Sequence, residues 1–153
     1  MDIKHFLKLQ PGFESFSDAH LDALANMMSV VIYPAKHSFT LRGEQGHSFY
    51  LIMDGAVAVN DGDPLSEQDS DRLLRIGEWF GLLSLVENLP AFENCSATEN
   101  VTVAAFNRVQ FNDLIETAPP VGQHLLYMLA KQLARTLIAQ NNRLSAQARN
   151  TKK

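Results

Sequence analysis

Residues 80–97, FGLLSLVENLPAFENCSA, combine the outline of an anion-binding loop with a composition that opposes an anion. Gly81 stands where a short helix can begin, and Pro90 stands where it can end. The N–H groups at a helix N-terminus suit a phosphate. From Ile76 to Asn107, however, there is no Lys or Arg, and there are four glutamates. The stretch therefore predicts a backbone suited to an anion without the cations that would hold one.

The side chains that serve catalysis or metal binding elsewhere in proteins are scattered in this chain. The five histidines form no His-x-His pair, and Cys95 is the single cysteine, so neither a metal cluster nor an internal disulfide is expected. Ser84 lies in GLLSL, which is not a nucleophile elbow. The acidic segment 61–71 lacks the ligand order of an EF-hand and is typical of a polar hairpin tip. We expect a protein that is not an enzyme and has no metal or cofactor.

The segments that must position residues 80–97 change along the chain from a helical pattern to strand patterns. A short helix is predicted after Ser17, because Leu21, Leu24 and Met28 recur at helical spacing. Short strands follow, rich in β-branched and aromatic residues and separated by Pro, Gly and charged turns. In the longest predicted strand, Phe49, Leu51 and Met53 share one face. Val57 and Val59 follow a tight turn at Gly55. The last clear strand is predicted at 101–107. Residues 108–117 look like one or two helical turns.

The last part of the chain predicts a long helix, about 119–146, followed by a flexible basic tail at 147–153. Leucines recur from Leu126 to Leu144 at helical spacing, and Gln140 and Asn141 interrupt the apolar stripe. The fold class expected is α+β, mainly β: an antiparallel double-stranded β-helix, or jelly roll, with short N-terminal helices and the long C-terminal helix. The roll is expected at about 29–107, within a single domain of residues 1–146.

Composition restricts the setting and the partners. The chain has 153 residues and a net charge of −4, without a secretory signal or an apolar run that could cross a membrane, which favours the cytoplasm. Residues 1–116 hold 7 basic and 17 acidic side chains, whereas residues 117–153 hold 6 basic and no acidic ones. The basic C-terminal part is explained by cations favoured in the later part of a helix or paired with the acidic roll.

The order of these segments resembles the cyclic-nucleotide-binding domain family, which includes the sensor half of the catabolite activator protein and protein kinase A regulatory subunits. The matching stretches are YPAKHSFTLRGEQGHSFYLIMDGAVAV and GEWFGLLSLVENLPAFENCSATENVTVAAFNRVQF. The resemblance covers roughly residues 6–144. It implies a regulatory β-roll that binds its ligand in a cassette between two strands.

In the resembled family the cassette begins at Phe-Gly-Glu, the Glu binds the ribose hydroxyl, and a downstream Arg clamps the phosphate. Phe80 and Gly81 match, but Leu82 replaces the Glu, Ala91 replaces the Arg, and Phe92 fills a position that is normally small. The residues assigned to this degenerate cassette are Phe80, Gly81, Leu82, Leu83, Ser84, Ala91, Phe92, Glu93 and Asn94.

The two replacements should weaken cyclic-nucleotide binding strongly. A hydrogen bond to a charged group contributes roughly 1.5–3 kcal/mol. Losing two such contacts costs roughly 3–6 kcal/mol, or about 10²–10⁴ in affinity. Glu93 would repel the phosphate further. We therefore expect a sensor or regulatory module for a small molecule other than a classical cyclic nucleotide. The alternatives are a scaffold or protein-interaction domain whose pocket is filled by its own side chains, and a diverged domain that still binds a cyclic nucleotide weakly.

The resemblance also bears on assembly. In the family the C-terminal helix makes the dimer, so a homodimer is expected here, with Leu126, Leu129, Leu133 and Leu137 at the interface. Sensor-type regulators continue into a helix-turn-helix domain, and none follows Lys153 in this sequence. DNA binding and membrane association by this chain are accordingly not expected.

Overall fold

A computed structural model of the chain describes residues 2–60, 72–86 and 89–151. The predicted tip at 61–71 lies outside the described residues. The helical elements are α1 (Ile3–Lys8), α2 (Asp18–Met27), the 3-10 turn η1 (Leu82–Leu85), α3 (Arg108–Thr117) and α4 (Pro119–Thr151). The strands are β1 (Ser29–Tyr33), β2 (Ser38–Thr40), β3 (Ser48–Asp54), β4 (Val57–Asn60), β5 (Arg72–Leu74), β6 (Trp79–Phe80), β7 (Asn94–Ala97) and β8 (Val101–Asn107).

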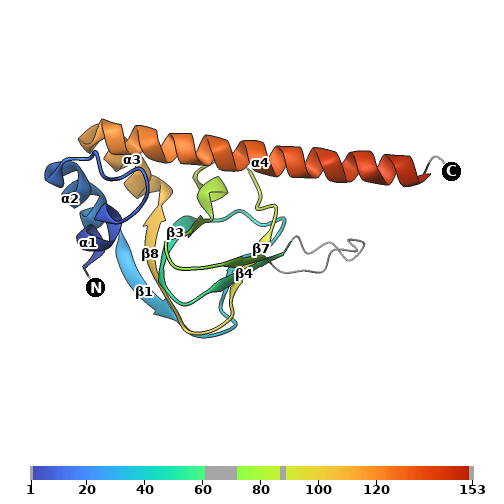
Figure 1. Ribbon diagram of the computed structural model, residues 1–153, viewed down its shortest axis with the longest axis horizontal. Coiled ribbons are helices and arrows are strands. Elements are labelled where there is room, and N and C mark those ends of the chain that lie inside the picture. Colours follow the sequence, from blue (N-terminus) through green and yellow to red (C-terminus); the bar gives the residue numbers. More distant parts are fainter. Residues whose placement is uncertain (1, 61–71, 87–88, 152–153) are drawn as a thin grey trace.

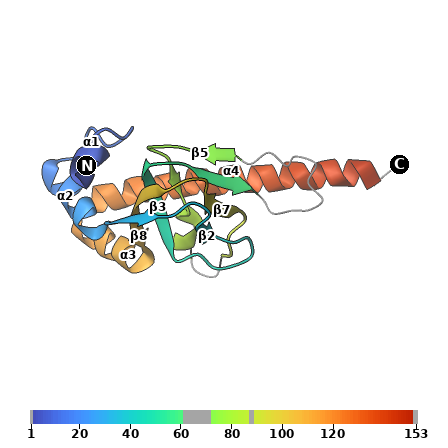
Figure 2. The same cartoon turned by 90° about the horizontal axis from the view of Figure 1, so that it is seen from below.

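The strands form two antiparallel sheets of four strands, in the orders β1-β8-β3-β6 and β2-β7-β4-β5. Figure 1 shows the two sheets as a roll, with α1, α2 and α3 at one end and α4 running along its side. In Figure 2, seen from below, the strands lie in front of α4, and α1, α2 and α3 gather at the same end as in Figure 1. The α+β jelly-roll prediction, with short N-terminal helices and a long C-terminal helix, is confirmed.

The alternation predicted for β3 divides the core in two. Phe49, Leu51 and Met53 belong to a cluster shared with the helices, whereas Ile52 belongs to the cluster between the sheets. β3 pairs with β8 over most of its length, and Val103 of β8 joins Ile52 between the sheets. Successive side chains of a strand point to opposite faces, so one strand pair supports both cores.

The cap predicted at Ser17 is confirmed, and the structure adds a second cap and changes the lengths of two helices. The Ser17 hydroxyl accepts a hydrogen bond from the backbone N–H of His20 and caps α2. Asn107 and Gln110 form a reciprocal capping box at the start of α3. α3 has ten residues, longer than the one or two turns predicted. α4 continues to Thr151, so residues 147–151 of the predicted tail are helical.

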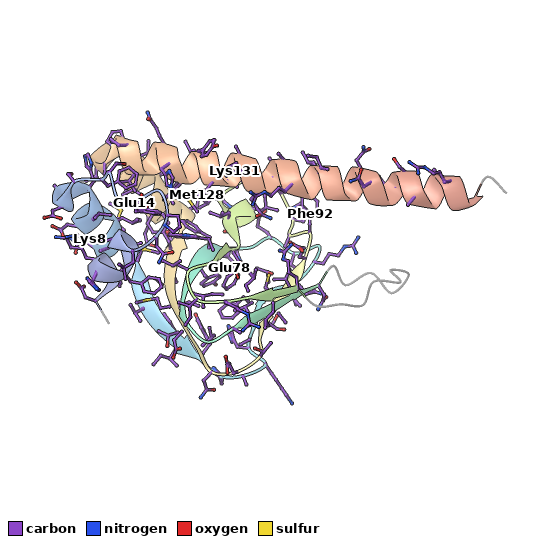
Figure 3. The ribbon with its side chains drawn as sticks, in the orientation of Figure 1. Lys8, Glu14, Glu78, Phe92, Met128 and Lys131 are labelled. Atoms are coloured by element: carbon purple, nitrogen blue, oxygen red, sulfur yellow. The ribbon has the colours of Figure 1, made fainter. Side chains whose placement is uncertain are left out.

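The N-terminal segment is fixed to α4 by aromatic packing around His124. Its imidazole meets the rings of Phe13 and Phe16 edge-on, with centroid distances of 5.0 and 5.6 Å. Burial lowers the pKa of His124, although the Glu14 carboxylate acts in the opposite direction. Figure 3 shows Glu14 at the end of the molecule where α4 begins. The start of α4 is thus anchored, and its direction along the roll is set.

The turn between β3 and β4 allows a direct test of the close contact between Gly55 and the backbone of Asn100. Gly55 has φ of +87°, and a methyl group there would lie 2.6 Å from the Asn100 carbonyl oxygen. We predict that Gly55→Ala lowers the free energy of unfolding by about 2–4 kcal/mol, from backbone strain and the clash together. Denaturant unfolding followed by circular dichroism measures the change.

Gly43→Ala is the matched control, because Gly43 has φ of +88° and nothing lies within 4 Å of the added methyl group. Strain alone should cost about 1–2 kcal/mol. Equal losses for the two variants would show that the close approach at Asn100 is unimportant.

Candidate functional site

The residues predicted as a cassette surround a cavity that opens between the roll and α4. The volume of the cavity is about 60 Å³, and the space counted out through its open mouth into solvent is about 620 Å³. The lining includes all the predicted cassette residues except Asn94. The lining residues are Thr40, Gly46, Val59, Arg72, Leu74, Trp79, Phe80, Gly81, Leu82, Leu83, Ser84, Leu89, Ala91, Phe92, Glu93, Cys95 and Gln132.

The turn η1 forms one wall of the cavity. Gly81 precedes it with φ of +79°, and a methyl group there would lie 2.9 Å from the Ser48 carbonyl oxygen. Glycine is therefore required for the chain to leave β6 and enter the turn. Leu82 is 5% exposed and packs in the same core cluster as Leu129 of α4. The side chain that replaces the family's acid is thus also part of the helical core.

A second wall is formed by Leu89, Ala91, Phe92, Glu93 and Cys95. Ala91 is held in place by backbone hydrogen bonds: its N–H donates to the Glu44 carbonyl at 2.9 Å, and its carbonyl accepts from the Gly43 N–H at 2.8 Å. Asn94 does not line the cavity. Its Oδ1 accepts from the Arg42 backbone N–H, and its Nδ2 donates to Asn60, so its visible role is to hold neighbouring segments.

Phe92 lines the cavity but does not fill it. The side chain is half-buried, and Figure 3 shows it on the side of the roll next to α4. The side chains of the lining therefore do not fill the cavity completely.

A cation that the local sequence did not indicate enters the cavity from β5. Arg72 pairs with Val59 in strand register, and Val59 pairs with Cys95 on its other side, so the three residues form a row across adjacent strands. The guanidinium Nη2 of Arg72 lies 3.6 Å from Oε1 of Glu93. The expectation of an acidic site without a cation is corrected: the cavity has one arginine, and Glu93 opposes its charge.

Two further polar groups come from outside the predicted stretch. Gln132 brings an amide from α4 to the cavity lining. Arg108, the first residue of α3, donates from Nη2 to the Ser84 carbonyl at 3.2 Å and ties the turn to α3. Neither was a candidate from the sequence, because both lie outside the stretch that suggested the site.

The Ser84 hydroxyl differs from the other polar groups of the cavity. Ser84 is 5% exposed, and its Oγ has no hydrogen-bond partner. By contrast, the Thr40 hydroxyl donates to the Glu93 carbonyl at 3.1 Å. A buried polar group without a partner is uncommon and calls for an explanation.

Among the described residues, no three His, Cys, Asp or Glu side chains lie close enough together to hold a metal ion. Within the same residues, no helix has the length and apolar character needed to span a bilayer.

The predicted dimer residues differ in exposure. Leu129 is 8% exposed and packs in the roll's own helical core. Leu133 is half-buried, whereas Leu126 and Leu137 are 43% and 54% exposed. The structure thus places Leu129 against the roll and leaves the other three at least partly accessible.

Comparison with known proteins agrees with this geometry. The family described as "Cyclic nucleotide-binding domain" matches residues 30–118, more than half of the chain. The chain is 25% identical over 133 residues to a CRP-like cAMP-activated global transcriptional regulator of Mycobacterium tuberculosis, covering 87% of this chain and 58% of the regulator. It is 32% identical over 110 residues to a cAMP-dependent protein kinase regulatory subunit of Candida albicans, covering 72% and 23% of the two chains.

A solved structure, the Thermus thermophilus Catabolite Activator Protein, shares the fold with a TM-score of 0.70 at 24% identity. The match covers 87% of this chain and 62% of that one. The chain thus spans about three fifths of these bacterial regulators and about a quarter of the kinase regulatory subunit. The Mycobacterium regulator and the Candida regulatory subunit are named for cyclic AMP, and the Thermus protein is named as an activator.

The reactivity of the Cys95 thiol tests whether the interior of the cavity is buried. It is 6% exposed, and burial raises the pKa of its thiol to about 11. At pH 8 about one thiol in a thousand is then ionised. We predict that Ellman's reagent reacts at least 100-fold more slowly with the native protein than with protein unfolded in guanidinium. Because the unfolded thiol ionises near pH 9.0, the same shift should lower folding stability as pH rises from 9 toward 11. Rapid stoichiometric reaction of the native protein would contradict the burial of Cys95.

Proposed function

This chain belongs to the cyclic nucleotide-binding domain family, and from that premise we propose that it is a non-catalytic sensor or regulatory module that does not bind cyclic AMP or cyclic GMP in the family's usual way. The observation that carries the proposal is the cavity itself. It is open, yet Leu82 and Ala91 line it where the resembled cassette has an acid and an arginine.

The electrostatics of the described lining support the same conclusion. Its charged side chains are Arg72 and Glu93, which oppose one another at 3.6 Å. A cyclic phosphate entering the cavity would compete with Glu93 for Arg72 and would bring a second negative charge close to that carboxylate. Two like charges at such distances repel one another, more strongly where water is partly excluded. The arginine contributed by β5 therefore does not replace the missing clamp.

We propose further that the module forms a homodimer through α4 and acts in the cytoplasm. α4 extends well beyond the roll (Figure 1), and exposed leucines remain on it. Positions 126, 130, 133, 137, 140 and 144 alternate in steps of four and three, the spacing of a coiled-coil seam. Leu126, Leu137 and Leu144 on this seam are 43%, 54% and 62% exposed. A second copy would cover these side chains.

Restoring the missing cassette residues tests the proposed lack of cyclic-nucleotide binding. We predict that 100 µM cyclic AMP or cyclic GMP leaves the melting temperature of the natural sequence unchanged. The double variant Leu82→Glu with Ala91→Arg should be stabilised by several degrees, because a ligand that binds only the folded state stabilises it by mass action. Differential scanning fluorimetry measures both.

The control carries the same two charges on the surface, Asn112→Glu with Asn142→Arg, at exposed positions outside the cavity lining. It should show no shift. A several-degree shift of the natural sequence at micromolar nucleotide would overturn the proposal in favour of a diverged domain that still binds a cyclic nucleotide.

The dimer is tested by Leu133→Glu, which places a charge in the centre of the seam. We predict a change from dimer to monomer in sedimentation or light scattering at about 50 µM protein, because an unpaired buried charge is strongly unfavourable. Asn142→Glu introduces the same charge at an exposed position off the seam and should remain dimeric. An unchanged mass for Leu133→Glu would show that α4 is not the interface.

A further inference from the structure

The walls of the cavity are mainly apolar over several elements. β5 and β6 contribute Leu74, Trp79 and Phe80, and η1 contributes Leu82 and Leu83. Leu89 and Phe92 extend this surface along the segment that leads into β7. Such a lining gains free energy by contacting an apolar molecule and offers little to a highly hydrated one.

The charges in the described part of the lining do not favour an anion. Arg72 and Glu93 are the two charged side chains there, and they oppose one another. The side chains of Arg72 and Glu93 are 59% and 33% exposed, so water screens the pair in part. An anion would be attracted by Arg72 and repelled by Glu93, and a cation the reverse, so the pair gives neither a strong net attraction. Binding of an uncharged ligand does not depend on either charge.

One polar group points to something more specific than a hydrocarbon. The Ser84 Oγ is buried without a partner in a residue that lines the cavity. The Ser84 carbonyl is already engaged by Arg108, and the Ser84 N–H donates to the Gly81 carbonyl. The hydroxyl is the remaining polar group of this residue. It is covered by protein atoms, so the Ser84 side chain would have to turn toward the cavity for a ligand to satisfy it with one hydrogen bond.

From these three observations we infer that the cavity takes an uncharged, mainly apolar small molecule carrying a hydrogen-bonding group, in preference to an anion. This inference rests on the proposed sensor function, because it names the class of ligand for the same cavity. The apolar body contacts η1 and Phe92, the hydrogen-bonding group meets Ser84, and the Arg72–Glu93 pair gives a charged ligand no strong net attraction.

Two fluorescent probes that share one aromatic body test the inference. N-phenyl-1-naphthylamine is uncharged and has one N–H group, whereas 8-anilino-1-naphthalenesulfonate adds a sulfonate. We expect the uncharged probe to bind the natural sequence at one site per chain and at least tenfold more tightly than the sulfonate. Ser84→Ala should weaken the uncharged probe several-fold. Glu93→Gln removes the carboxylate opposite Arg72 and should improve binding of the sulfonate at least fivefold.

Blocking variants show whether the probes occupy the cavity. Ala91→Trp and Leu89→Trp each place an indole in the lining and should each abolish binding of the uncharged probe. Asn112→Trp adds the same group at an exposed position of α3 and should leave binding unchanged. Circular dichroism and thermal unfolding confirm that each variant is folded, and the second blocking variant serves if the first is not.

The outcomes separate the two levels of the proposal. If the sulfonate binds at least as tightly as the uncharged probe and both are lost in the blocking variants, the ligand class is wrong and the sensor function stands. If neither probe responds to either folded blocking variant, the cavity does not bind ligands of this kind, and the sensor function fails with the inference.

Discussion

The pairing of β3 with β8 is the constraint on which the rest of the structure depends. Because the side chains of a strand alternate, this pair presents Phe49 and Leu51 to the helices and Ile52 to the second sheet. A shift of one residue in register would exchange the two sets and expose both cores to the wrong neighbours. The turn at Gly55, pressed against the backbone of Asn100, fixes where β3 ends. The two cores, and therefore the positions of the helices relative to the sheets, follow from this pair.

The cavity is a consequence of the same arrangement. β6 continues the sheet from β3, and η1 leaves it at Gly81 and packs beneath α4. Leu82 and Leu129 bind the turn to the helix, while Arg108 binds it to α3 through the Ser84 carbonyl. Each wall of the site is therefore attached to an element that also serves the core. This explains how a cassette can lose an acid and an arginine and keep its shape, since the backbone is held by packing rather than by a ligand.

The same attachment joins the cavity to the proposed dimer seam. Gln132 lines the cavity and is followed directly by Leu133 on the seam. Adjacent helical positions point in different directions, so one turn of α4 carries a side chain for each surface. Leu129, one helical turn earlier, is buried against the roll. The exposed positions of the seam lie on either side of this anchored turn.

The sequence by itself determined the fold class, the β3 alternation, the cap at Ser17, and the stretch that forms most of the cavity, because each depends on neighbouring residues. It determined also that the acid and the arginine of the resembled cassette are missing. It could not give the length of α3 or the partners of Asn94, because contacts with other elements decide them. It also placed the end of α4 at about residue 146, whereas the helix continues through residue 151. Only the tertiary structure brought Arg72 opposite Glu93 and Gln132 into the cavity. Strand pairing and helix docking create those contacts between residues distant in sequence, and the free energy of burial that fixes them belongs to the whole fold.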